Sequence, residues 1–310
     1  MTAGGSTPLH FADRLAALVE ERRSRVVLGL DPDPSALWPE AVERVAGGPD
    51  APHLARARTA EAVTDHCRAA IVAAGPACVA VKPQLACFER LGAPGWEALE
   101  QVVAIANDHG LLVLADGKRG DVPVTAAAYG QALVGATPTP FGEVAGLGAD
   151  AFTANPLLGR DALEPLVESA AAAGAGCFVL VRTSNPGAAP LQDSGEPPLH
   201  ERLAGLVAEL GRDRRGECGL SLVGAVTGAT RPEHLSRLRE LMPHAIFLLP
   251  GVGAQGGRVE DLGAAFAPHP AAGLVPASRS IVNAHAERGG DPAAAAAAAA
   301  EELRAAAWEL

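Results

Sequence analysis

The sequence contains no apolar run long enough to cross a membrane. Its 310 residues are 48% hydrophobic and 20% charged, and no stretch of about 18 uncharged apolar residues occurs. Its first residues lack the basic segment and following apolar segment of a secretory leader. We therefore expect a cytoplasmic chain without a membrane span, with enough apolar residues for a large buried core.

Patterns typical of disulfide frameworks and metal sites are also absent. The five cysteines form an odd number without a C-x-x-C pair, and the nine histidines include no H-x-x-x-H pair. Such cysteines are typical of reduced thiols, and such histidines do not match ligand spacing. We predict no metal site and five reduced thiols, at Cys67, Cys78, Cys87, Cys177 and Cys218.

Basic residues are too few for a nucleic-acid partner. The chain has 25 Lys and Arg against 36 Asp and Glu, a formal charge of −11, whereas binding a phosphate backbone needs a basic surface. One small anionic ligand remains compatible with this charge, because backbone N–H groups and one or two cations can hold it in a cleft.

The chain does contain eight short apolar runs, separated by helical segments rich in alanine and leucine. Consecutive apolar positions indicate strands buried on both faces, and intervening helices indicate parallel pairing. Eight such units predict an α/β fold, a (β/α)8 TIM barrel formed by residues 1–310 as a single domain. The runs are 25–30, 78–82, 111–116, 150–155, 177–182, 221–226, 245–250 and 272–277.

Three segments fall outside this alternation. We expect residues 1–8 to be flexible and an extra amphipathic N-terminal helix to follow them. The Gly- and Pro-rich segment 46–58 predicts an inserted surface loop between strands one and two. The tail 291–310 is rich in Ala, Glu and Leu, which are strong helix formers, and it predicts a final packing helix.

Charged residues stand at the carboxyl ends of the first three runs. Asp31 follows the first run, Lys82 ends the second, and the third leads into "ADGKRGD", which holds Asp116, Lys118 and Asp121. Active sites of such barrels lie at the carboxyl ends of the strands. Asp116 and Lys118 are two positions apart, so we expect them to point the same way. Because buried charges must be paired, this alternating array favours a catalytic site over ordinary turns.

A glycine-rich segment after the seventh run predicts an anion site. Residues 251–257, "GVGAQGG", satisfy G-x-G-x-x-G, but the dinucleotide fingerprint also needs an acid about 20 residues later, and residues 262–286 contain none. Glycine-rich backbone after strand seven, with Arg279 after strand eight, instead favours a phosphate site, which such barrels place there.

These motifs together resemble one enzyme family. "LGLDPDP", Lys82, "DGKRGDV", "TSNPG", "GAVTGAT", "PGVGAQGG" and "SRSI" are similar to orotidine 5′-monophosphate decarboxylases, in particular to their longer bacterial subfamily, over nearly all of the chain. The D-x-K-x-x-D pattern is shared with sugar-phosphate decarboxylases and synthases of the same superfamily. The presence of Lys82 together with this pattern narrows the resemblance to the orotidine 5′-monophosphate decarboxylases.

The resemblance implies conversion of orotidine 5′-monophosphate (OMP) to uridine 5′-monophosphate (UMP) and CO2, the last step of de novo pyrimidine synthesis, without cofactor or metal. Lys118 is then the general acid that protonates a C6 carbanion stabilised by fixed charges. The resemblance also implies a homodimer with shared active sites, in which Asp121 and Thr125 serve the partner's site. The implied catalytic residues are Lys82, Asp116, Lys118 and Asp121; the implied substrate-binding residues are Asp31 for the ribose, Thr125, Ser184 for the pyrimidine, and Gly253, Gln255 and Arg279 for the phosphate.

Two alternatives remain open. A magnesium-dependent sugar-phosphate decarboxylase or synthase of the same superfamily resembles the chain at D-x-K-x-x-D, but it places an acidic metal ligand where Lys82 stands. A non-catalytic nucleotide-binding barrel would bind UMP or OMP without turnover. An assay of OMP loss with and without chelator separates all three.

Overall fold

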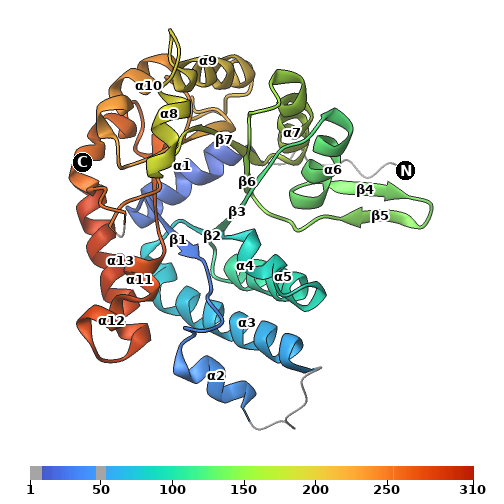
Figure 1. Cartoon of the computed structure of the whole chain (residues 1–310), viewed down its shortest axis with the longest axis vertical. Helices are drawn as coiled ribbons and strands as arrows, with labels where there is room; N and C mark the ends of the chain where they lie inside the picture. Colours follow the sequence, from blue (N-terminus) through green and yellow to red (C-terminus); the bar gives the residue numbers. More distant parts are fainter. Residues whose placement is uncertain (1–8, 47–53, 254) are drawn as a thin grey trace.

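Eight parallel strands close into a barrel surrounded by helices, which confirms the predicted architecture (Figure 1). The computed structural model describes residues 9–46, 54–253 and 255–310. The segment 1–8, predicted to be flexible, lies outside the described residues. Each predicted run overlaps one strand, in the order β1 (Val26–Leu30), β2 (Ala80–Pro83), β3 (Leu112–Arg119), β6 (Ala151–Ala154), β7 (Gly176–Arg182), β8 (Val223–Thr227), β9 (Phe247–Leu248) and β10 (Gly273–Ala277), which pairs with β1.

Helices connect the barrel strands and cover their outer faces (Figure 1). The predicted terminal helix is present as α13, which begins after Asp291, whose carboxylate accepts a hydrogen bond from the Ala294 N–H. After β9 the connection is a 3₁₀ helix, η5 (Val259–Phe266). The α-helices are α1 (Phe11–Arg22), α2 (Pro39–Val45), α3 (Ala55–Ala74), α4 (Leu85–Glu89), α5 (Ala93–Asp108), α6 (Pro123–Leu133), α7 (Arg160–Ala173), α8 (Ala189–Gln192), α9 (Leu199–Gly211), α10 (Leu235–Leu241), α11 (Arg279–Val282), α12 (Ala284–Arg288) and α13 (Pro292–Trp308).

The extra N-terminal helix, α1, covers the amino-terminal end of the barrel. Phe11 at its start packs edge to face on Phe178, with ring centroids 5.9 Å apart. It also lies against Gly176, the first residue of β7, where an added Cβ would come within 2.7 Å of the Phe11 ring. With this end covered, the opposite end, where the strands finish, is left for a ligand.

The strands divide the core into an inner and an outer layer. Alternate strand residues such as Val27, Leu114 and Leu274 pack inside the barrel together with α1. Their neighbours, such as Leu28 and Val275, pack outward among the helices. Burial on both faces explains why the strand sequences are continuously apolar rather than alternating. Among the helices of the described residues, none is long and apolar enough to cross a bilayer.

Two boundaries differ from the prediction. Residues 55–58 belong to α3 instead of the inserted loop predicted at 46–58, because their Ala-Arg-Ala-Arg sequence continues the helix toward its amino end; residues 47–53 of that loop lie outside the described residues. Strand β3 continues to Arg119 instead of ending at Asp116, and its pairing with β6 is irregular between Ala115 and Arg119.

An antiparallel hairpin that the sequence analysis did not predict projects from the barrel beside α6 (Figure 1). Its strands are β4 (Ala136–Thr139) and β5 (Gly142–Ala145), and Phe141 in the turn is fully exposed. Both strands are largely exposed and carry Pro and Gly, so they lack the apolar pattern that predicts a strand.

Candidate active site

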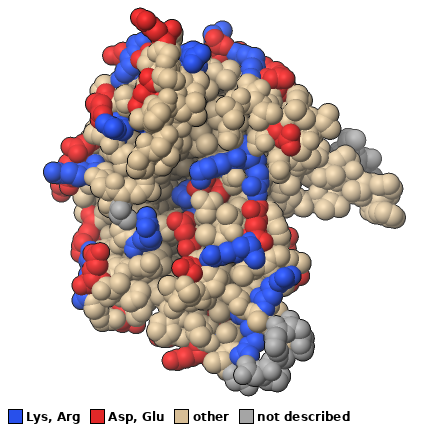
Figure 2. Space-filling model, in the orientation of Figure 1, with Lys and Arg blue, Asp and Glu red and all other residues tan. Residues whose placement is uncertain are grey.

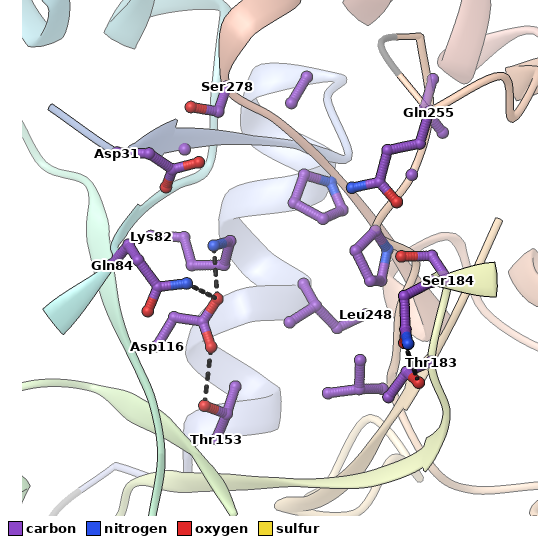
Figure 3. Close-up of a pocket in the computed structure, with 18 of the residues that line it drawn as sticks. Asp31, Lys82, Gln84, Asp116, Thr153, Thr183, Ser184, Leu248, Gln255 and Ser278 are labelled. Carbon is purple, nitrogen blue, oxygen red and sulfur yellow. Dashed lines mark hydrogen bonds and ion pairs between the residues drawn. The ribbon is translucent and has the colours of Figure 1, made fainter. Parts of the chain in front are cut away.

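A cavity of about 380 Å³ opens at the carboxyl ends of the strands. All eight barrel strands, or the residues directly after them, contribute to its lining. Its floor is formed by Leu180, Val226 and Leu248 of the inner core layer. Polar side chains stand around Leu248 in Figure 3. Charged residues of both signs meet near the middle of this face of the molecule (Figure 2). A concave site in which polar groups converge above an apolar floor is typical of small-molecule binding.

The carboxylate of Asp116 is the centre of the charged wall. Its Oδ2 accepts a hydrogen bond from Lys82 Nζ at 2.6 Å, and its Oδ1 accepts one from Lys118 Nζ at 2.6 Å. The Thr153 hydroxyl donates to Oδ1 at 2.9 Å (Figure 3). Asp116 is therefore fixed by charge-assisted hydrogen bonds to both of its oxygens.

Burial and pairing set the protonation of this array. Burial alone raises the pKa of Asp116, but Lys82 and Lys118 outweigh it and hold the pKa at about 2. Burial likewise acts to lower the pKa of Lys82, and the charges of Asp116 and Asp31 reverse this effect, so that the pKa is raised. At neutral pH the Asp116 carboxylate and the Lys82 ammonium are both charged.

The backbone of Lys118 adopts a conformation that is rare outside glycine. Its φ is 49°, in the left-handed region, and its N–H donates to Thr153 Oγ1 at 2.8 Å. The Lys118 side chain, 43% exposed, therefore reaches the cavity from a break in the regular strand. Such strained residues concentrate at functional sites, because the surrounding structure must hold them there.

Asp31 and Ser184, two of the predicted substrate-binding residues, both line the cavity. Asp31 lies directly after β1, on the same side as Lys82 and Asp116, and Ser184 faces them from the other side of the cavity (Figure 3). The site can therefore hold a ligand between a charged wall and a hydroxyl-bearing wall.

The glycine-rich segment 251–257 and Arg279, predicted to bind an anion, both contribute to the cavity lining. Gly251, Gln255 and Arg279 all line it. Gly251 has a φ of 109°, and an added Cβ would come within about 3.1 Å of Ser184 Cβ, so only glycine fits this turn. Gly253 is not among the lining residues; it lies against Ser280, which does line the cavity.

Asp121 and Thr125 are not brought into the cavity of their own chain. The Asp121 carboxylate accepts a hydrogen bond from the Val122 N–H at 2.7 Å, at the amino end of α6, and Thr125 is exposed on that helix. Neither residue lines the cavity. A single chain thus assembles three of the four predicted catalytic residues.

Two polar residues of the site were missed by the sequence analysis. Thr153 binds both Asp116 and the Lys118 backbone, and the Gln84 amide lies 3.5 Å from Asp116 Oδ2. A polar residue within the apolar run "DAFTAN" and a glutamine two positions after Lys82 were the available signals. Both are weak, because such residues also occur as ordinary strand ends.

The fold and the site together define a (β/α)8-barrel protein with a paired Lys–Asp–Lys array beside a glycine-rich loop. A family model described as "Orotidine 5'-phosphate decarboxylase / HUMPS family" matches residues 24–302. The chain therefore belongs to the orotidine 5′-phosphate decarboxylase family.

The chain is similar to several known proteins named orotidine 5′-phosphate decarboxylase or OMP decarboxylase. The orotidine 5′-phosphate decarboxylase of Rhodopirellula baltica is 40% identical over 97% of this chain and 97% of its own length. That of Haloarcula marismortui is 42% identical over 88% of this chain and 87% of its own. The solved structure of Leishmania donovani OMP decarboxylase is 30% identical, with a TM-score of 0.71, and the match covers 96% of this chain and 99% of that one.

Proposed function

We propose that the chain converts OMP to UMP and CO2, the last step of de novo UMP synthesis, with Lys82, Asp116 and Lys118 as its chemical groups. The observation that carries the proposal is the paired array of two ammonium groups on one buried carboxylate, beside a loop suited to phosphate. Relatives in this family carry the name of the same carboxy-lyase activity.

The reaction explains why a lysine is needed at this point. Cleavage of the bond between C6 and the carboxylate leaves an electron pair on C6, and the ring offers no electron sink of the pyridoxal or thiamine kind. A fixed positive charge beside C6 stabilises the developing carbanion. Lys118 supplies that charge and then donates its proton to C6, which completes UMP.

Asp116 and Lys82 support this step. Asp116 orients the Lys118 ammonium, and its negative charge opposes that of the substrate carboxylate, which leaves as neutral CO2. Lys82, which is buried, anchors the other oxygen of Asp116. Asp31 binds the ribose, Ser184 contacts the pyrimidine, and Gln255 and Arg279 bind the phosphate, with Gly253 shaping the backbone of that loop.

A homodimer with shared active sites is part of the proposal. Asp121 and Thr125 lie outside their own cavity, while the array inside pairs two ammonium groups with one carboxylate. The segment 121–125, at the start of α6, also exposes Val122 and Val124, at 53% and 85%, an apolar surface suited to a second copy of the chain. Asp121 from the partner then completes the predicted set of two lysines and two aspartates.

Two further parts of the proposal concern compartment and metal. A cytoplasmic location agrees with the five cysteines, all of which are free thiols.

A cofactor-free reaction agrees with the position of Lys82, whose ammonium would repel Mg²⁺ beside Asp116. In the part of the chain that the structure describes, no group of three or more His, Cys, Asp or Glu side chains could hold a metal ion.

A spectrophotometric assay of OMP loss, with and without EDTA, tests the proposal. Turnover that EDTA does not change is the expected result. Turnover that EDTA abolishes would favour the magnesium-dependent relatives. Binding of UMP without any loss of OMP would make the chain a nucleotide-binding barrel.

A further inference from the structure

The segment Thr183–Asn185 forms the cavity wall that faces Asp116. It follows β7 directly, and all three of its residues line the cavity. In Figure 3, Thr183 and Ser184 stand across the cavity from Asp116 and Lys82. The segment lies beyond the last strand residue, so strand pairing alone does not fix its position.

An ion pair between the buried Arg182 and the partly exposed Asp193, behind this wall, holds the segment. Arg182, only 3% exposed, donates from Nε to Asp193 Oδ1 at 2.7 Å and from a terminal nitrogen to Asp193 Oδ2 at 3.0 Å. Its other terminal nitrogen donates to the Thr183 carbonyl oxygen at 2.5 Å. The hydrogen bonds from Arg182 hold the pKa of Asp193 below its usual range, so the pair stays charged at neutral pH.

Gln192 adds a second attachment next to this pair. Its Oε1 accepts a hydrogen bond from the Thr183 N–H at 2.8 Å, and its Nε2 donates to the Thr183 hydroxyl at 3.0 Å. Both backbone polar groups of Thr183 are therefore bound by side chains of this cluster, which we call the Arg182–Gln192–Asp193 clamp. A bidentate ion pair and two amide hydrogen bonds leave little freedom to the residue before Ser184.

The other side of the segment is held by the loop after β8. The Thr230 hydroxyl donates to the Ser184 carbonyl oxygen at 3.0 Å. Gly228 packs so closely that an added Cβ would come within 2.8 Å of Ser184 Cα. Ser184 is thus confined from both sides, while its own side chain is left for a ligand.

We propose that Gln192 and Asp193 are positioning residues that act through Arg182 and Thr183 to hold Ser184 against the base of a bound nucleotide. The clamp therefore affects affinity for the pyrimidine end of the ligand more than affinity for the phosphate end, since Gln255 and Arg279 belong to other segments of the chain and, among the described glycines of the glycine-rich segment, only Gly251 packs on Ser184. This inference rests on the proposed function, from which the identity of the base is taken.

Calorimetric titration with two probes tests the inference. UMP carries both base and phosphate, whereas ribose 5-phosphate lacks the base. We expect Gln192→Ala and Asp193→Asn to weaken UMP binding about tenfold, the effect of a lost hydrogen bond network, and to leave ribose 5-phosphate binding within about twofold of the wild type. Gln192→Glu keeps an acceptor for the Thr183 N–H and should retain most of the UMP affinity.

The matched control is Glu302→Gln, which removes one partner of a bidentate pair with Arg288 on the surface away from the cavity. It should bind both probes as the wild type does. Unchanged UMP binding in the Gln192 and Asp193 variants, or an equal loss for both probes, would overturn the inference. If Asp193→Asn fails to fold, the comparison of Gln192→Ala with Gln192→Glu decides alone.

The proposed function fails in a different way. A wild-type chain that neither binds UMP nor consumes OMP would remove that function, whatever the variants do. A wild type that does both, together with clamp variants that bind UMP normally, would remove only the role of the clamp.

Discussion

The ammonium of Lys118 lies 2.6 Å from Asp116 Oδ1, and the ammonium of Lys82 lies 2.6 Å from the other oxygen of the same carboxylate. Asp116 is 5% exposed and Lys82 is 8% exposed, so these charges are buried and depend on one another. Removal of one partner leaves an uncompensated buried charge, which is strongly destabilising. Lys118, by contrast, is partly exposed and can be replaced with less effect on folding.

That difference makes Lys118→Ala the informative variant for the chemical step. Turnover of OMP should fall by at least about 10³-fold, because both the proton donor and the charge beside C6 are lost. UMP affinity should change by less than about tenfold, since the base and phosphate contacts remain. Single-turnover kinetics and UMP titration measure the two effects separately. Substantial residual turnover would remove Lys118 from the role of general acid.

The pH dependence of stability should report the Asp116 array. The pKa of Asp116 is about 2 in the folded chain, below its ordinary value of 3.8. Its pairing therefore stabilises the fold fully above about pH 4, and this contribution is lost as the pH falls toward 2. The shift corresponds to about 2 kcal/mol.

Denaturant unfolding at several pH values checks this expectation. The free-energy difference between wild type and Asp116→Asn should be constant above about pH 5 and shrink by about 2 kcal/mol toward pH 2. Asparagine does not titrate, so the change belongs to the wild-type carboxylate. A difference that stays constant down to pH 2 would contradict the low pKa of Asp116.

Much of this site was predictable from sequence, but not always for the right reason. The residues Asp116 and Lys118 were expected to point the same way because strand residues alternate. In the structure they meet where the strand is irregular and Lys118 has a left-handed backbone. The contact with Thr153 that fixes this geometry joins residues 35 and 37 positions apart, a relation that local patterns do not contain.

The barrel itself was predictable because buried parallel strands are apolar on both faces, which gives a strong local signal. The hairpin that exposes Phe141 gives no such signal, because its strands face solvent. The clamp could not be predicted for another reason: Gln192 and Asp193 stand at the end of the short helix α8 in a sequence without a distinctive pattern, and only the fold brings them to Thr183 and Arg182.

Arg279 should govern affinity for the phosphate. Loss of its charge-assisted hydrogen bonds in Arg279→Ala should raise the KM for OMP by roughly 10- to 100-fold, with a smaller effect on kcat. Turnover of orotidine, which lacks the phosphate, should be the same in variant and wild type. Arg288→Ala, a surface change away from the cavity, is the control. An unchanged KM for OMP would count against the phosphate assignment.

The shared active site can be tested by mixing two inactive variants. Lys118→Ala retains Asp121, and Asp121→Ala retains Lys118. If Asp121 acts in the partner's site, a mixed dimer contains one site with both residues intact and one with neither. Half of the dimers are mixed after random exchange, so about a quarter of wild-type activity per chain should return.

Sedimentation velocity and the activity of the mixture, after dilution and reassociation, provide the measurement. If Asp121 acted within its own chain, each chain of a mixed dimer would still lack one catalytic residue, and mixing would restore nothing. The same null result from a chain that sediments as a monomer would instead reject the dimer. Because Asp121 binds only the Val122 N–H in its own chain among the contacts of the described residues, recovery on mixing is the expected outcome.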